Sequence, residues 1–211
     1  MKNKKLIVTV LILLLPMLIG LLFYNKLPEQ MPIHWDINGN IDAYGDKLIV
    51  VILPNILMIF FQVICIFFIN NDQKNYQQNQ KIINLIYWLI PFVSIFCNTL
   101  MYLSILNIKI NIINFVGMFL GIIFLILGNY LPKCIINTTI GIRLPWTLND
   151  EKVWNETHRF GGKVWFLSGL LLIILSLINK INGIILLLIL LISIIIPLFY
   201  SYYFYQKSKV L

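Results

Sequence analysis

Two stretches of this 211-residue sequence combine a histidine with acidic side chains, the residue types that bind metals or transfer protons. In the first stretch His34 precedes side-chain oxygens at alternate positions, as in an EF-hand calcium loop: Asp36, Asn38, Asn40 and Asp42. However, Ile41 occupies the position that needs glycine, and Lys47 the position that needs a bidentate acid. His34 with Asp36 could supply half of another metal site, but the other histidine lies far along the chain. We therefore expect a hydrogen-bonded structural histidine, with no metal or cofactor.

In the second stretch His158 follows Glu156 and Thr157, a combination that could suggest a hydrolytic centre. Consecutive residues of a helix point in different directions, so these three side chains cannot converge on one substrate. The chain contains no nucleophile motif, paired carboxylates, HExxH motif or phosphate-binding loop. Its three cysteines lack the spacing of a disulfide framework or a zinc site. The sequence therefore predicts that the protein is not an enzyme.

The elements that must position these stretches are membrane-spanning helices. The chain is 60% hydrophobic and 11% charged, and its mean hydropathy is +0.88, values typical of a polytopic membrane protein. Apolar runs long enough to cross a bilayer predict an all-α membrane protein with six spans, at 6–24, 48–69, 82–106, 113–131, 164–178 and 183–205.

The distribution of positive charge predicts the orientation of the spans. Twelve lysines and arginines fall at the termini and in alternate loops on one side, and four fall on the other side. We therefore expect both termini in the cytoplasm of a bacterial plasma-membrane protein, an outer loop at 25–47 and an inner loop at 128–163. The net charge of +8 then reflects topology, and direct binding to nucleic acid is not expected.

The expected spans contain no Asp, Glu, Lys, Arg or His, the groups on which ion-coupled transporters usually depend. Polar residues such as Asn55, Gln62 and Asn98 are explained by hydrogen bonds between helices. A small transporter or lipid-handling protein remains an alternative, because four prolines can kink the helices and the third span is polar.

Both loops carry local folding signals. In the outer loop Pro28 and Pro32 stiffen the chain, Asn38-Gly39 predicts a hairpin turn, and Gly45 predicts a second tight bend. An ordered outer cap follows from these signals.

In the inner loop the residues from Thr147 to Asp150 form a capping box, which predicts a short amphipathic helix from near Leu148 to about Phe160. Gly161-Gly162 would end that helix, and one of its faces would carry Val153, Trp154, Thr157 and His158. Arg143 lies between apolar neighbours, so it binds either headgroup phosphates or carbonyls of its own loop.

The same residues resemble a known family. GNYLPK at 128–133, Asn137, GIRLPWTL at 141–148, Trp154 and THRFGGK at 157–163 closely resemble the signature of the SdpI family of bacterial toxin-immunity membrane proteins. The outer loop LPxxMPIHWxxxGxxDxYGDK resembles a small domain of unknown function that is usually found at the N-terminus of those proteins. The departure is Leu144, where members often have Thr, and it puts one hydrogen bond in doubt.

The resemblance implies an immunity protein that protects its cell from a secreted peptide toxin. It also implies a toxin receptor that holds a cytoplasmic transcriptional repressor at the membrane, and membrane lipids as further partners. Two regions are expected, an N-terminal membrane region at 1–106 and an SdpI-like membrane region at 107–211. The candidate residues of the inner signature loop are Asn129, Asn137, Gly141, Arg143, Pro145, Trp146, Thr147, Trp154, Thr157, His158, Arg159 and Gly162. Those of the outer loop are Pro28, Pro32, His34, Trp35, Gly39, Asp42 and Gly45.

Overall fold

The computed structural model describes residues 2–106, 108 and 110–209, and it divides the chain into two compact units. The first unit comprises Met1–Asn71 with Ile83–Ile110, and the second comprises Asp72–Ile82 with Asn111–Leu211. The connection at 72–82 therefore belongs with the second half of the chain. The regional boundary expected at 106/107 falls next to residues 107 and 109, which lie outside the described residues.

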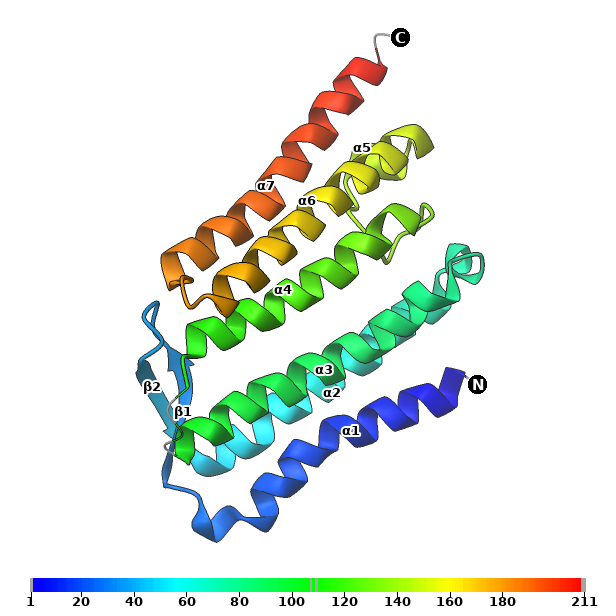
Figure 1. The fold of residues 1–211 in the computed structure, drawn as a ribbon. Helices are drawn as coiled ribbons and strands as arrows, with labels where there is room; N and C mark the ends of the chain where they lie inside the picture. Colours follow the sequence, from blue (N-terminus) through cyan, green and yellow to red (C-terminus); the bar gives the residue numbers. More distant parts are fainter. Residues whose placement is uncertain (1, 107, 109, 210–211) are drawn as a thin grey trace. The chain divides into compact units, whose positions relative to one another are not determined.

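The described residues contain six helices that are long and apolar enough to cross a membrane, which confirms the predicted number of spans. The first unit holds three of them: α1 (Lys2–Leu22), α2 (Lys47–Asn71) and α3 (Gln80–Ile105), whose first turn belongs to the second unit (Figure 1). In this unit Asn98 Nδ2 donates to Asn55 Oδ1 at 3.1 Å, and Gln62 Nε2 donates to Thr9 Oγ1 at 3.0 Å. The prediction of hydrogen bonds between helices is therefore confirmed, because each pair joins two different helices.

A β-hairpin between α1 and α2 forms the ordered cap predicted for the first loop. Strand β1 (Gln30–Trp35) pairs antiparallel with β2 (Ile41–Asp46), and a short 3₁₀ helix, η1 (Tyr24–Lys26), precedes them (Figure 1). The predicted turn is confirmed, because Gly39 has φ 85° and its N–H donates to Asp36 O at 2.9 Å.

The second bend predicted at Gly45 is wrong. Gly45 lies within β2 opposite Met31 and is not among the residues with positive φ in the described chain. A Cβ atom at this position would come within 2.9 Å of Val50 Cγ2. Glycine is therefore needed there for close packing of the strand on the start of α2, and not for a turn.

The second unit contains the other three spans, α4 (Ile112–Tyr130), α6 (Glu151–Leu177) and α7 (Gly183–Ser208), and α6 packs against both of its neighbours (Figure 1). Further short helices lie in the connections between spans. In chain order, η2 (Gln73–Tyr76) lies between α2 and α3, and η3 (Leu131–Lys133) and α5 (Pro145–Leu148) lie between α4 and α6.

Glycines bring α4 and α6 into close contact. A Cβ atom on Gly128 would lie 2.5 Å from Phe166 N, and one on Gly162 would lie 2.7 Å from Gly128 O. Further along α6, a Cβ atom on Gly169 would lie 2.6 Å from Gly121 O of α4. Small residues permit this approach because helices in lipid associate through close packing and not through a hydrophobic driving force.

This packing corrects the predicted end of the inner-loop helix. The helix does not start near Leu148 and end at Gly161-Gly162, since α6 begins at Glu151 and continues through both glycines to Leu177. Asp150 caps its start by accepting the Val153 N–H at 3.0 Å. Gly161 and Gly162 are buried, and they serve contact with neighbouring side chains instead of a helix end.

Candidate functional site

The signature segment (residues 128–163) folds around His158, whose side chain is completely buried. His158 Nε2 accepts the backbone N–H of Ile142 at 2.9 Å, and Nδ1 lies 2.8 Å from the carbonyl oxygen of Trp154. Because Nε2 accepts a hydrogen bond, the proton must sit on Nδ1 and the imidazole is neutral. The ring also stacks on Trp154 with their centroids 3.9 Å apart. Both ring nitrogens are thus occupied in holding the chain, and neither is free to accept a proton from a substrate.

Gly141 faces this imidazole and is required there for two reasons. Its φ of 111° lies in the region that L side chains rarely adopt. A Cβ atom would also collide with His158 Nε2 and come within 3.2 Å of Trp154 Cη2. The glycine of the GIRLPWTL motif therefore allows the backbone to pass directly over the buried histidine.

Asn137 organises the turn that precedes Gly141, and it is also fully buried. Its Oδ1 accepts the N–H groups of Thr139 at 2.8 Å and Ile140 at 2.6 Å. Its Nδ2 donates to the carbonyls of Ile135 at 2.8 Å and Ile140 at 3.0 Å. The side chain thus satisfies four backbone groups of an irregular segment, which is how such backbone is tolerated near a membrane.

Asp72, which the sequence reasoning missed, holds the same turn from the α2–α3 connection. Its Oδ2 accepts the Thr138 N–H at 2.9 Å and the Thr138 hydroxyl at 2.8 Å, while Oδ1 accepts the Lys74 N–H at 3.0 Å. Burial alone would raise the pKa of this carboxyl, but the hydrogen bonds from Thr138, Lys74 and Thr139 outweigh it and lower the pKa below 3.8. A signal existed in the sequence, since Asp72 is the only acidic residue between Asp46 and Asp150.

A second polar cluster joins the segment to α7. Trp146 Nε1 donates to Ser201 Oγ at 2.9 Å, and Thr157 Oγ1 donates to the same oxygen at 2.8 Å. Thr147 Oγ1 donates to Ile142 O at 2.9 Å and accepts the Leu144 N–H at 2.8 Å, so the predicted capping box does not form. The hydroxyl of Thr147 closes the loop locally, which is why α6 starts later than expected.

Arg143 ties down a carbonyl of its own loop, the second of the two roles considered for it. Its Nη1 donates to Thr138 O at 2.5 Å, and the side chain is otherwise exposed. Three further candidates are also exposed: Asn129 accepts from Lys133, Pro145 begins α5, and Arg159 lies 3.9 Å from Glu156. Trp154, by contrast, is fully buried and donates from Nε1 to Cys134 O at 2.8 Å.

The candidates in the hairpin are more accessible. His34 Nδ1 lies 2.6 Å from Asp42 Oδ1, and both side chains are largely exposed, at 68% and 45%. Asp36 instead accepts the N–H groups of Asn38 and Asn40, each at 2.8 Å, and so shapes the turn. Pro28 precedes β1, Pro32 is buried within it, and Trp35 Nε1 is buried without a hydrogen-bond partner among the described residues.

Neither region assembles a catalytic or metal-binding arrangement within the described part of the chain. No three His, Cys, Asp or Glu side chains gather there as they would around an ion. Instead, Asn137 and His158 of the signature segment, together with Asp72 of the α2–α3 connection, form hydrogen bonds that fix backbone groups of the segment. We call this arrangement the frame.

Comparison with known proteins connects this frame to a family. Residues 133–201 match the SdpI/YfhL protein family, and residues 11–59 match a domain of unknown function, DUF1648. The chain is 32% identical over 177 residues to "Immunity protein SdpI" of Bacillus subtilis (strain 168), an alignment that covers 82% of each protein. No solved structure matches the chain. With six helices able to span a membrane and this extent of similarity, the chain is a multi-pass membrane protein that belongs to the SdpI family.

Proposed function

We propose that this protein is an immunity protein that protects its cell from a secreted peptide toxin, and that it does so by binding and not by catalysis. The observation that carries the proposal is the similarity to the Bacillus subtilis immunity protein over 82% of both chains. The SdpI family is not an enzyme family. Consistent with a binding role, the polar side chains of the signature segment are engaged in fixing its own backbone.

The hairpin is the surface that we propose for toxin contact. With the N-terminus in the cytoplasm, the hairpin follows the first span and faces outward. The segment from Lys26 to Lys47 carries four acidic residues, Glu29, Asp36, Asp42 and Asp46, against two lysines. A net charge of −2 would attract a cationic peptide modestly.

The signature segment would face inward under the same topology, because it follows the fourth span. The α2–α3 connection must face the same side of the membrane. The hydrogen bonds that Thr138 donates to Asp72 of this connection agree with that requirement. We further propose that the protein acts as a toxin receptor that holds a transcriptional repressor at this inner surface. Coupling between the two faces would then pass through the spans.

Survival of a toxin-sensitive strain that expresses this protein tests the proposal of immunity. We expect expression to restore growth in the presence of the toxin, and Asp42→Asn in the hairpin to reduce protection without lowering the amount of protein in the membrane. Glu156→Gln on α6 serves as a control, since Glu156 lies outside the hairpin and its ion pair with Arg159 is long, at 3.9 Å. Unchanged killing by every related toxin would argue against the proposal.

The receptor role needs a separate measurement. A fluorescently tagged repressor is expected at the membrane in the presence of toxin and dispersed in its absence. Arg143→Ala should weaken this recruitment while leaving survival intact, because Arg143 is exposed on the signature segment. Loss of survival and recruitment together would mean that Arg143 acts structurally.

A transporter has less support as an alternative. The amides of Asn55 and Asn98 are hydrogen-bonded to each other, and Gln62 donates to Thr9 and to the Tyr87 carbonyl. The amide nitrogens of these side chains are therefore engaged in hydrogen bonds between helices, which accounts for them without a substrate path.

A further inference from the structure

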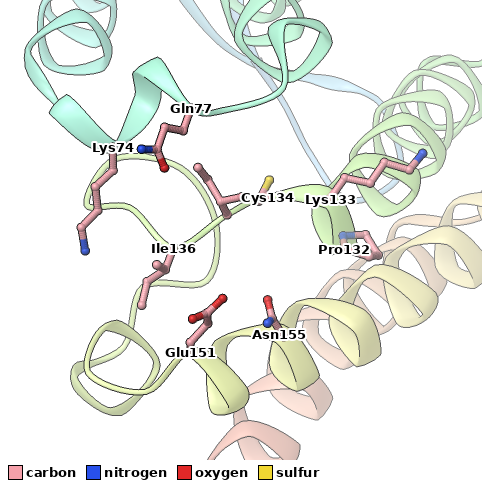
Figure 2. Close-up of a pocket in the computed structure, with 9 residues that line it drawn as sticks. Lys74, Gln77, Pro132, Lys133, Cys134, Ile136, Glu151 and Asn155 are labelled. Atoms are coloured by element: carbon pink, nitrogen blue, oxygen red, sulfur yellow. The ribbon is translucent and has the colours of Figure 1, made fainter.

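A pocket of about 400 Å³ opens beside the signature segment, within the second unit. Its walls come from η2, from the chain that follows η3, and from the first turns of α6 (Figure 2). Four polar side chains line it on two sides, Lys74 and Gln77 on the η2 side and Glu151 and Asn155 on α6. Lys133 of η3 also borders it, and Ile135 and Ile136 supply apolar surface. This volume lies within the range of about 300–1,000 Å³ that is usual for small-molecule sites.

The four polar side chains of this pocket are not engaged with one another. Lys74, Gln77, Glu151 and Asn155 make no side-chain hydrogen bond or ion pair to any residue that the structure describes. In Figure 2, Lys74 and Gln77 lie on one side of the space, and the ends of Glu151 and Asn155 point toward it from the other. An ammonium and a carboxylate thus border the same pocket without forming a pair.

Lys133 differs from these four residues although it also borders the pocket. Its Nζ donates to Asn129 Oδ1 at 3.2 Å and lies 5.0 Å from the centre of the Tyr130 ring. Figure 2 shows this side chain directed away from the space. The pocket therefore presents one available cation, Lys74, and one available anion, Glu151, among the residues described.

The side chain of Gln78, the residue that follows the pocket-lining Gln77, is also buried. Gln78 Oε1 accepts the N–H of Ile135 at 3.4 Å and that of Asn79 at 3.2 Å, which fixes the orientation of the amide. Its Nε2 is buried and has no hydrogen-bond partner among the described residues. Unpartnered buried donors are rare, so a polar group outside the chain, such as water, is expected at Nε2; Gln78 adjoins the pocket through Gln77 and Ile135 without lining it.

The place of the pocket in the fold indicates which kind of ligand can bind there. The pocket lies where α4 ends and α6 begins, and both helices are membrane spans, so it is at the level of lipid headgroups. Pockets at this level that contain Lys or Arg can bind the phosphates of lipid headgroups, and Lys74 supplies such a cation here. The exposed Ile135 beside it is suited to contact with an acyl chain.

We propose that this pocket binds the headgroup of an aminophospholipid of the phosphatidylethanolamine class. The phosphate would accept from Lys74 and Gln77, and the primary ammonium would donate to Glu151 and Asn155. Phosphatidylglycerol has no cation for Glu151, and the trimethylammonium of phosphatidylcholine has no N–H to donate. The inference does not depend on the toxin or on which face of the membrane the pocket occupies.

Native mass spectrometry of the full-length protein, released from detergent with added short-chain lipids, tests this proposal. We expect phosphatidylethanolamine to bind about tenfold more tightly than phosphatidylcholine or phosphatidylglycerol, the effect of one or two charge-assisted hydrogen bonds. Glu151→Gln should reduce the preference over phosphatidylcholine severalfold, because the ammonium loses its charged acceptor while Asn155 remains. Lys74→Gln should weaken phosphatidylethanolamine and phosphatidylglycerol alike, because both carry the phosphate.

Glu156→Gln and Lys152→Gln are matched controls, since they lie on the same helix and do not line the pocket. Both should bind phosphatidylethanolamine as the unaltered protein does, and melting curves of all four variants should overlay. Equal binding of the three lipids within about twofold would overturn the proposal, as would an unchanged preference in Glu151→Gln. Tighter binding of phosphatidylglycerol than of phosphatidylethanolamine would also overturn it, because that order indicates a purely anionic ligand.

Discussion

The hairpin and the signature segment carry similar polar residues but use them in opposite ways. In the hairpin the histidine pairs with Asp42 at the surface, and both side chains remain open to solvent. In the signature segment His158 is fully buried and bonds two backbone groups. A patterned polar motif in a membrane protein can therefore hold irregular backbone in place with buried side chains such as His158, and leave only its exposed side chains, such as Arg143, available to a partner.

Glycine substitutions should give the largest difference between the two regions. Gly141→Ala places a side chain at φ 111° and against His158, whereas Gly39→Ala imposes only the unfavourable φ of 85°. We expect Gly141→Ala to lower the free energy of unfolding by about 3 kcal/mol or more, and Gly39→Ala by about 1 kcal/mol. Melting of the purified protein in detergent measures both. Equal losses would mean that the signature segment is no more constrained than the hairpin turn.

Histidine substitutions should separate the regions next. His158→Ala removes the acceptor of the Ile142 N–H and the stack on Trp154, so we expect a loss of about 2–4 kcal/mol in unfolding free energy. His34→Ala alters an exposed pair and should leave the melting temperature nearly unchanged. If survival in the presence of the toxin falls only in His34→Ala, that result supports the hairpin as the surface that contacts the toxin.

Asn137→Asp tests whether the frame depends on donors as well as acceptors. The aspartate keeps the shape and the two acceptor contacts but loses the donation to the carbonyls of Ile135 and Ile140. We expect a loss of about 2 kcal/mol in unfolding free energy, since two backbone carbonyls lose their partner and face a carboxylate instead. Asn38→Asp in the exposed hairpin turn is the comparison: it places a carboxylate beside Asp36, where solvent screens the repulsion, and should cost less than about 1 kcal/mol. A melting temperature unchanged by Asn137→Asp would contradict the role assigned to this amide.

The smallest expected effect concerns pH. The pKa of the Asp72 carboxyl is lowered in the folded protein, so its contribution to stability is present above the unfolded value of 3.8 and is lost as the pH falls through the folded value. The melting temperatures of the unaltered protein and of Asp72→Asn should therefore differ at pH 7 and converge as the pH falls below 3.8 and through the folded pKa. If the difference persists in acid, the stability lost in Asp72→Asn has a cause other than the charge of Asp72.

Several features followed from the sequence because their causes are local. Hydropathy over about 20 residues predicts each span, and Asn38-Gly39 predicts the hairpin turn through its backbone conformation. The helical period placed Val153, Trp154, Thr157 and His158 on one face, and all four are buried together. The start of the inner helix was predicted too early, because the hydroxyl of Thr147 closes the preceding loop and Asp150 caps α6 instead.

Tertiary structure alone decided the remaining features, because their causes lie far apart in the chain. Asp72 reaches a turn 66 residues away, and Ser201 meets Trp146 across 55 residues, so no local pattern reveals either bond. Gly161-Gly162 resembles a helix end, yet Gly128 of α4 and Pro132 of η3 lie at contact distance from Gly162 and make a small residue favourable inside the helix. The sequence by itself therefore determined the spans, the hairpin and the buried face, whereas the partners that turn the signature segment into a frame exist only in the folded protein.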